Sequence, residues 1–258
     1  MTEWNAAGYA RISQLQKAMA DEALALLMLA GGERVLDVGC GDGKITAEVA
    51  ARVPRGSVVG VDPSREMIAF ASTHFGDGIG GNLRFEVADA RSLPFSDAFG
   101  VVVSFNALHW VPEQRTAIAS IRTALDDGGR MLARLVVKGT RTSLEEVVEE
   151  ARKSPRWSHY FGNFSDPYLR LTAEQYTALA IDVGFRVRSA QTHDKAWNFE
   201  SRDAFRAFCG VGLVAWTRRL PDDAVAPFID DVLERYRAVV GDDAMFRFYQ
   251  LDVVLDRR

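Results

Sequence analysis

The sequence predicts an α/β protein with a doubly wound, mostly parallel seven-stranded sheet and helical cap insertions between the later strands. Between residues 34 and 137, short β-branched runs alternate with stretches of helical periodicity, as successive βαβ units require. Beyond Lys138 this alternation gives way to additional helical segments around the last two strands. We expect these segments to cover an active site at the end of the sheet.

Seven runs are predicted as strands from their β-branched or continuously apolar composition. The run 101–105 is apolar over most of its length, which is typical of a strand buried on both faces of a parallel sheet. The predicted strands are residues 34–38, 57–61, 83–87, 101–105, 130–137, 185–190 and 246–255.

Apolar residues at helical spacing predict the helices between these strands. The pair Gly31-Gly32 ends the first helix, and Gly184 ends the helix before the sixth strand. Residues 126–129 are expected to form a turn. The predicted helices are residues 12–29, 44–52, 64–75, 113–125, 143–152, 172–183, 202–218 and 222–240.

The length of 258 residues and the hydrophobic content of 48% fit one large α/β domain. We therefore expect a single domain over residues 1–258. Within it, residues 31–137 would form a cofactor-binding core, and residues 139–171 and 200–241 would form the helical cap insertions.

The composition narrows the range of partners and compartments. A net charge of −4 provides no positive field for nucleic acid or anionic lipid, so we expect neither partner. The apolar run 23–30 is shorter than the roughly 20 residues of a membrane span, and Asp21 and Glu22 before it are unlike a signal peptide. Two cysteines do not make a disulfide framework and are consistent with a reducing compartment, so we expect a cytoplasmic protein. The oligomeric state stays open.

The predicted first strand runs into a glycine-rich turn. Gly39, Gly41 and Gly43 lack the Cβ atom that would keep a ligand away from the backbone. A dinucleotide fingerprint that begins at Gly39 needs a small residue at position 44, where this chain has Lys44. The alternate spacing therefore disfavours a nicotinamide-dependent oxidoreductase.

Two carboxylates follow the next two strands. Asp62 ends the second strand, where it can accept hydrogen bonds from ribose hydroxyls. Asp89 follows the third strand, where it can accept a hydrogen bond from an adenine amine. Either carboxylate alone could be an ordinary solvated side chain at a strand end. The two carboxylates on successive strands together indicate a nucleoside site.

The segments 35–43, 61–64, 88–90 and 104–106 resemble the motifs of class I S-adenosylmethionine-dependent methyltransferases. The resemblance covers roughly residues 31–137 and implies S-adenosylmethionine as the cofactor. It places Asp37 and the glycines at the methionine end, Asp62 at the ribose and Asp89 at the adenine. Gly100 and the pair Asp126-Asp127 depart from the family pattern without touching the cofactor. The other positions expected at the cofactor are Cys40, Pro63, Ser64, Met67, Ala90, Asn106 and Ala107.

A narrower resemblance rests on Trp4-Asn5, Tyr9, Gln16 and the run Asn106-Ala107-Leu108-His109-Trp110-Val111. These positions are similar to the trans-aconitate and juvenile hormone acid methyltransferases, which esterify carboxylic acids. The resemblance implies that Tyr9 and Gln16 close over the cofactor and that His109 and Trp110 border the substrate. It implies a small-molecule substrate and favours a carboxylic acid oxygen as the methyl acceptor. Phenols, amines, carbon nucleophiles and a non-catalytic binding role stay open as alternatives.

His109 is the candidate catalytic residue, either as a base or as a hydrogen-bond donor to the acceptor, and otherwise as a cap on the helix near Pro112. Arg134, Arg156 and Arg170 are candidates for a carboxylate clamp, unless they are only solvated surface residues. The four histidines show no metal-binding spacing, so we expect no metal. Aromatic residues of the later chain would form an apolar substrate pocket or part of the core, namely Trp157, Tyr160, Phe161, Trp197, Phe199 and Trp216.

Overall fold

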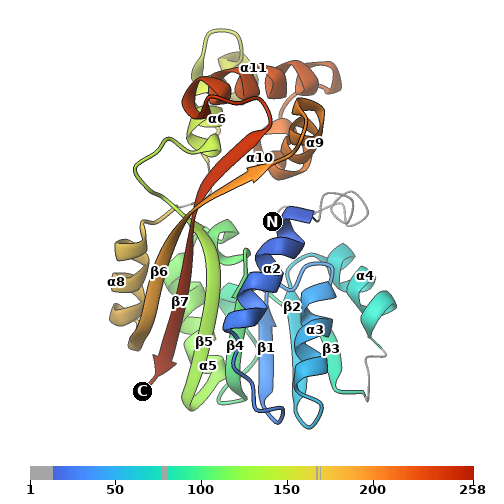
Figure 1. The fold of residues 1–258 in the computed structure, drawn as a ribbon, viewed down its shortest axis with the longest axis vertical. Helices are drawn as coiled ribbons and strands as arrows, with labels where there is room; N and C mark the ends of the chain where they lie inside the picture. Colours follow the sequence, from blue (N-terminus) through green and yellow to red (C-terminus); the bar gives the residue numbers. More distant parts are fainter. Residues whose placement is uncertain (1–13, 77–80, 167, 169) are drawn as a thin grey trace.

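The computed structural model describes residues 14–76, 81–166, 168 and 170–258. In this part of the chain, seven strands form one sheet in the order β3-β2-β1-β4-β5-β7-β6 (Figure 1). Strand β7 is antiparallel to both of its neighbours, and the other adjacent pairs are parallel. The predicted fold class is confirmed. The strands are β1 (Arg34–Val38), β2 (Ser57–Asp62), β3 (Leu83–Val87), β4 (Phe99–Phe105), β5 (Leu125–Val137), β6 (Phe185–Asn198) and β7 (Met245–Arg257).

The central strands β1 and β4 are apolar because helices cover both faces of the sheet. Leu36 of β1 lies beside Val102 of β4 in the parallel register, and both side chains are buried. The two strands end at the same edge of the sheet, so the loops that follow them meet there. This edge is where ligands bind in open α/β sheets.

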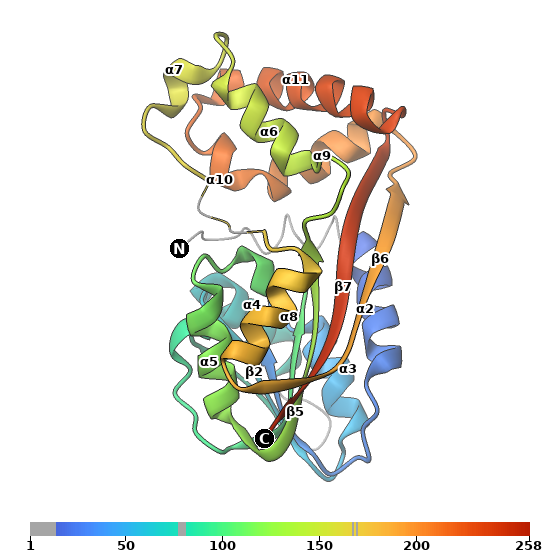
Figure 2. The ribbon, with the colours of Figure 1, turned by 90° about the vertical axis from the view of Figure 1, so that its left-hand side faces the viewer.

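Helices pack on both faces of the sheet (Figure 2). On one face, α5 (Gln114–Ala124) and α8 (Ala173–Asp182) share a hydrophobic core with β4, β5 and β7. On the other face, α2 (Gln14–Leu26) and α3 (Lys44–Arg52) pack against β1 and its neighbours. Helix α4 (Arg65–Phe75) follows β2 and contacts β2 and β3.

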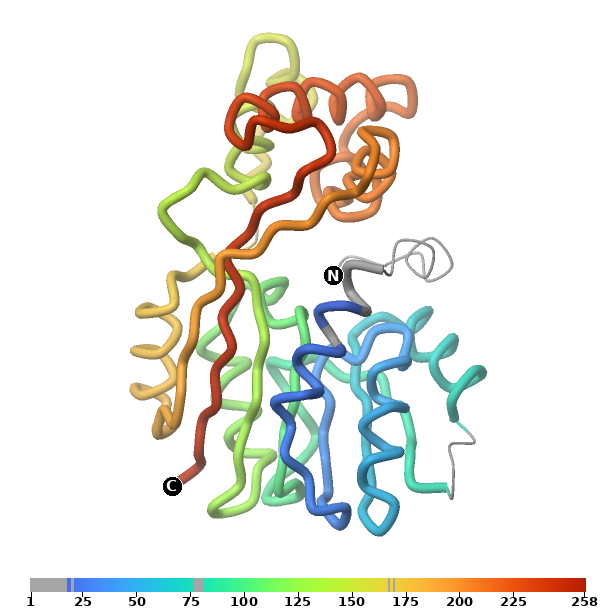
Figure 3. Tube along the Cα trace, viewed as in Figure 1, coloured from blue at the N-terminus to red at the C-terminus, as the bar shows by residue number. Residues whose placement is uncertain are grey.

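A group of helices lies beyond the carboxyl end of the sheet and has its own apolar core. Figure 3 shows that β6 and β7 continue past the ends of the other strands and lead into this group, which we call the cap. Its helices are α6 (Leu144–Lys153), α7 (Ser158–Phe161), α9 (Arg202–Gly212), α10 (Val214–Thr217) and α11 (Asp222–Val240).

Some predicted element boundaries are wrong. Strand β6 continues to Asn198 rather than ending at residue 190, because it pairs with β7 along its whole length. The predicted turn at residues 126–129 lies inside β5. The single helix expected over residues 202–218 is divided into α9 and α10 at Leu213, which has non-helical backbone angles (φ −99°, ψ 20°).

Candidate active site

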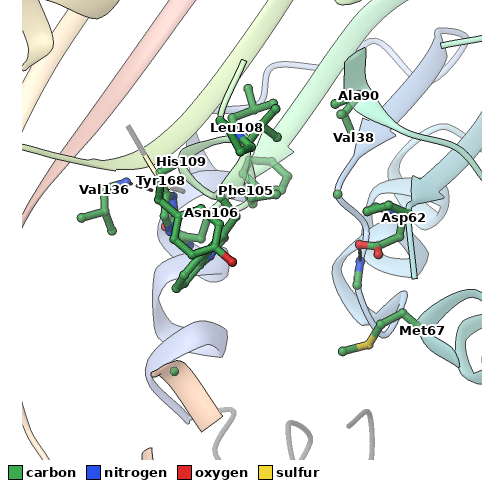
Figure 4. Close-up of a pocket in the computed structure, with 18 of the residues that line it drawn as sticks. Val38, Asp62, Met67, Ala90, Phe105, Asn106, Leu108, His109, Val136 and Tyr168 are labelled. Carbon is green, nitrogen blue, oxygen red and sulfur yellow. Dashed lines mark hydrogen bonds between the residues drawn. The ribbon is translucent and has the colours of Figure 1, made fainter. Parts of the chain in front are cut away.

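A cavity of about 410 Å³ lies between the carboxyl edge of the sheet and the cap. Its lower half is formed by the loops after β1, β2, β3 and β4, and its upper half by α6, α9, β7 and the residues Leu213 and Arg218 on either side of α10. Figure 4 shows Asp62 and Met67 on one side of this cavity and Asn106 and His109 on the other.

The loop after β1 has the backbone that its glycines permit. Gly39, Gly41 and Gly43 have φ angles of 80°, 53° and 81°, in the left-handed region that favours glycine. A Cβ atom on Gly39 would lie 2.2 Å from Cβ of Ala107, so only glycine fits between the loops after β1 and β4. At Gly41 the corresponding position is open. Gly39 and Gly41 line the cavity, whereas Gly43 begins α3 behind it.

The side chain of Asp62 connects the loops that follow β1 and β2. One carboxylate oxygen accepts a hydrogen bond from the Gly41 backbone N–H at 3.2 Å, and the other accepts one from the Ser64 N–H at 2.9 Å. Ser64 in turn caps α4 by accepting from Met67 N–H. Asp62, Pro63 and Met67 line the cavity, whereas Ser64 is buried and supports the loop from beneath.

Asp37 and Cys40 lie behind the glycine loop and are not among the residues that line the cavity. Burial raises the pKa of Asp37 to about 7, although Thr46 donates a hydrogen bond to its carboxylate at 2.7 Å. Burial also raises the pKa of the Cys40 thiol well above its usual value. Cys40 is therefore a small buried side chain, and it lacks the depressed pKa of a reactive cysteine.

Asp89 and Ala90 line the cavity where β3 ends, as the sequence predicts. The carboxylate of Asp89 forms a two-pronged ion pair with Arg91, with a shortest distance of 2.6 Å. The hydrogen bonds from Arg91 hold the pKa of Asp89 below its usual value. Arg91 also pairs with Glu113 at 2.8 Å, which joins the loop after β3 to the start of α5.

The loop after β4 carries the candidate catalytic residue. Asn106 has a φ of 54°, which turns the chain sharply at the strand end, and its side-chain oxygen accepts from Gln250 at 3.1 Å. The 3-10 helix Leu108–Trp110 follows. Buried Gln114 fixes this turn because its amide donates to the carbonyl groups of Leu108 and Val111. Asn106, Ala107, His109 and Trp110 all line the cavity.

His109 has a defined hydrogen-bond partner. Its Nδ1 atom accepts from the backbone N–H of Val136 at 3.3 Å, and it does not cap the helix near Pro112. Burial lowers the pKa of His109 to about 3, and the positive charge of Arg170 adds to this effect. The ring is therefore neutral near pH 7. Because Nδ1 is the acceptor, the ring proton is on Nε2, and His109 can donate a hydrogen bond there.

The expected carboxylate clamp at Arg134 is wrong. Arg134 is buried and forms a two-pronged ion pair with Asp252, and it also donates to the Met19 carbonyl oxygen. It is not part of the cavity lining. Arg170 pairs with Asp166 and lines a smaller cavity of about 200 Å³, and Arg156 stacks over Trp157.

The expected aromatic pocket is also wrong in its residues. Trp157, Phe161 and Trp216 are buried in the core of the cap, where the two indole N–H groups donate to Asp231 and Glu149. Trp197 packs against that core, and Tyr160 is exposed. The aromatic residues that line the cavity are instead Phe105, Trp110, Tyr168, Phe208, Phe246 and Phe248.

Sequence reasoning missed the residues that the cap contributes to the cavity. An apolar side chain that faces a cavity has the same composition and spacing as one in the core, so no sequence signal separates Phe208 from Phe205. Tyr9 and Gln16 are the residues expected to close over the cofactor. Tyr9 lies outside the described residues, and Gln16 lies in α2 but its side chain is outside the described part.

The part of the cavity around Gly41 and Asp62, which we call the cofactor end, fits a nucleoside with an amino acid attached. The open backbone at Gly41 lies beside the carboxylate of Asp62, and the apolar side chains of Met67 and Ala90 line the same cavity. Among the described residues, no three His, Cys, Asp or Glu side chains gather as a metal site would require. None of the described helices has the length and apolarity to cross a membrane.

Known proteins with similar sequences are methyltransferases, which agrees with a cofactor site of this kind. Residues 35–129 match the family model of a methyltransferase domain. The chain is 29% identical to the trans-aconitate 2-methyltransferase of Variovorax paradoxus, over 91% of this chain and 89% of that protein. It is also 29% identical to the juvenile hormone acid O-methyltransferase of Drosophila melanogaster, over 79% of this chain and 71% of that protein.

Solved structures share the fold. The YcgJ protein of Bacillus subtilis superposes with a TM-score of 0.68 at 20% identity, covering 94% of this chain and 99% of that one. Fold, glycine loop and family match together define a class I methyltransferase. The chain is an S-adenosylmethionine-dependent methyltransferase, and it resembles the trans-aconitate and juvenile hormone acid methyltransferases.

Proposed function

We propose that this enzyme methylates a carboxylate oxygen of a small organic acid. The observation that carries the proposal is the hydrogen bond from Val136 N–H to Nδ1 of His109. It makes neutral His109 a donor at Nε2 and removes it as a base. An acceptor that reacts here must therefore arrive with its nucleophilic oxygen already ionised, or find its base elsewhere.

A carboxylic acid meets this requirement without help. Its pKa near 4 leaves it ionised at neutral pH, whereas a phenol or an ammonium group keeps its proton. The two carboxylates at the cofactor end already have hydrogen-bond partners, since Asp62 accepts hydrogen bonds from the loop backbone and Asp89 pairs with Arg91. Neither is suited to take a proton from an acceptor on the His109 side of the cavity.

The cofactor end would hold S-adenosylmethionine through Gly39, Gly41, Asp62 and Asp89, which fit its amino acid, ribose and adenine parts. When bound, this cofactor supplies a methyl group on a positively charged sulfur. The protein residues then have two tasks, which are to align the acceptor and to exclude water. In our proposal His109 Nε2–H holds one carboxylate oxygen and leaves the other as the nucleophile.

The relatives support the same acceptor class, because two of them are named for methylation of acids, trans-aconitate and juvenile hormone acid. The test is a panel of carboxylic acids, phenols and amines of similar size, with S-adenosylhomocysteine release as the readout. Turnover restricted to the acids, with a methyl ester as product, supports the proposal. Turnover restricted to phenols or amines contradicts it.

A further inference from the structure

The upper half of the cavity carries a continuous apolar surface, with Glu145 and Arg218 beside it. The apolar side chains that line this half come from α6, α9, β7 and the break between α9 and α10. They form a surface that we call the cap wall, which consists of Leu144, Phe208, Val211, Leu213, Phe246 and Phe248. Such a surface gains free energy when it covers hydrocarbon and gains little from a polar ligand.

The cap wall is held in place by the core of the cap. The rings of Phe208, Phe246 and Phe248 form a continuous row, with centroid distances of 5.5 and 4.9 Å. Leu144 and Leu213 are each at most 3% exposed. Packed side chains of this kind keep their shape when a ligand binds, so the wall is a preformed surface.

Charged groups around the cavity do not suit an acid with several carboxylates. Among the described lining residues the guanidinium groups are those of Arg91 and Arg218. Arg91 already pairs with Asp89 and Glu113. Glu145 adds a negative charge beside the cap wall. A second carboxylate on a substrate would meet at most one further cation, Arg218, and any other position would lie against apolar side chains or near Glu145, where a carboxylate is unfavourable.

From these observations we infer that the acceptor is an acid with one carboxylate and an extended apolar body that lies against the cap wall. The inference rests on the proposed function and adds the substrate class to it. The carboxylate faces His109, and the hydrocarbon part extends toward Phe208 and Phe246. The cap therefore selects the substrate by its apolar length.

The first experiment compares straight-chain acids from butanoic to decanoic acid, together with octanedioic acid and citric acid. We expect kcat/KM to rise about fourfold for each added methylene until the wall is covered. Octanedioic acid differs from octanoic acid only in a second carboxylate, and we expect at least about a tenfold lower kcat/KM for it. A flat length profile, or a preference for octanedioic or citric acid, overturns the inference and leaves the proposed function standing. Turnover of amines or phenols without any acid overturns both.

The second experiment shortens the apolar part of the cavity with a larger side chain in the cap wall. Val211→Trp fills part of the cavity from the end of α9, and we expect it to shift the optimum to shorter acids while butanoic acid is still methylated. Val225→Trp is the matched control, because Val225 packs on the cap core outside the cavity lining. An unchanged length optimum in Val211→Trp, or the same shift in Val225→Trp, contradicts the inference. Binding of S-adenosylhomocysteine by both variants verifies that the fold is retained.

Discussion

Arg134 of β5 and Asp252 of β7 form a buried two-pronged ion pair across the antiparallel part of the sheet. The nitrogen–oxygen distances are 2.6 and 2.7 Å. The same guanidinium group donates to the Met19 carbonyl oxygen and pairs with Glu22 at 3.2 Å, so it holds α2 against the sheet. Because Met19 lines the cavity, this pair also fixes one edge of the active site.

We expect Arg134→Met to lower the free energy of unfolding by about 3 kcal/mol, because it leaves the carboxylate of Asp252 buried without its main partner. Urea unfolding measures this change. Arg84→Met is the control, since Arg84 pairs with Glu86 on the surface and its loss should cost less than about 1 kcal/mol. Equal effects of the two substitutions would show that the buried pair does not anchor α2.

Asp62→Asn should weaken S-adenosylhomocysteine binding by about 1 to 3 kcal/mol, because it removes a charged acceptor at the cofactor end. Calorimetric titration gives the affinity directly. Asp42→Asn is the control. Asp42 is in the glycine loop after β1, accepts a hydrogen bond from the Lys44 N–H and does not line the cavity, so the affinity of this variant should stay close to that of the unchanged enzyme. If Asp62→Asn binds as tightly as Asp42→Asn, the ribose is not held at Asp62.

Gly39→Ala should destabilise the protein by about 1 to 3 kcal/mol, because the new methyl group would overlap with Ala107. The double variant with Ala107→Gly removes the overlap but keeps the unfavourable φ of 80°. Thermal unfolding of both should therefore show partial recovery in the double variant. A double variant no more stable than Gly39→Ala would mean that backbone strain alone sets the effect.

Gln250→Leu should lower kcat/KM by roughly fivefold to tenfold, since it removes the donor that orients Asn106 and contacts the Met19 sulfur. Affinity for S-adenosylhomocysteine should fall by a smaller factor, because Gln250 does not line the cavity and acts on the site only through Asn106. Steady-state kinetics and calorimetry separate the two quantities. A loss of cofactor affinity as large as the loss of kcat/KM would place the role of Gln250 in the fold rather than in the alignment of Asn106.

The succession of strands and helices along the chain, and the placement of Gly41 and Asp62 at the edge of the sheet, could be predicted from sequence because they depend on local signals. A glycine turn and a strand-end carboxylate, such as Gly41 and Asp62, must be next to strands that the composition already identifies. The role of Arg134 could not be predicted in this way. Its partner Asp252 is 118 residues away, and only the antiparallel pairing of β5 with β7 brings the two together.

The residues of the upper half of the site could not be predicted for a different reason. Trp216 and Phe208 are both aromatic residues of the cap, yet the first is fully buried and the second lines the cavity. Which of the two faces the cavity depends on the rotation of a short helix and on the break at Leu213, which the helical periodicity of residues 202–218 does not show.

The central claim is that His109 donates a hydrogen bond to an acceptor that is already ionised. The most direct test is the pH profile of kcat for an acid substrate at saturating cofactor, in the unchanged enzyme and in His109→Gln. Because burial lowers the pKa of His109 to about 3, its protonation does not change between roughly pH 6 and 9. Asp37, with a pKa of about 7, would affect both proteins alike.

We therefore predict that the two profiles have the same shape and that His109→Gln lowers kcat by about tenfold throughout, the order of magnitude expected for one hydrogen bond to a charged group. A fall in kcat below neutral pH that is present in the unchanged enzyme and absent in His109→Gln would contradict the account, because it would identify His109 as the base.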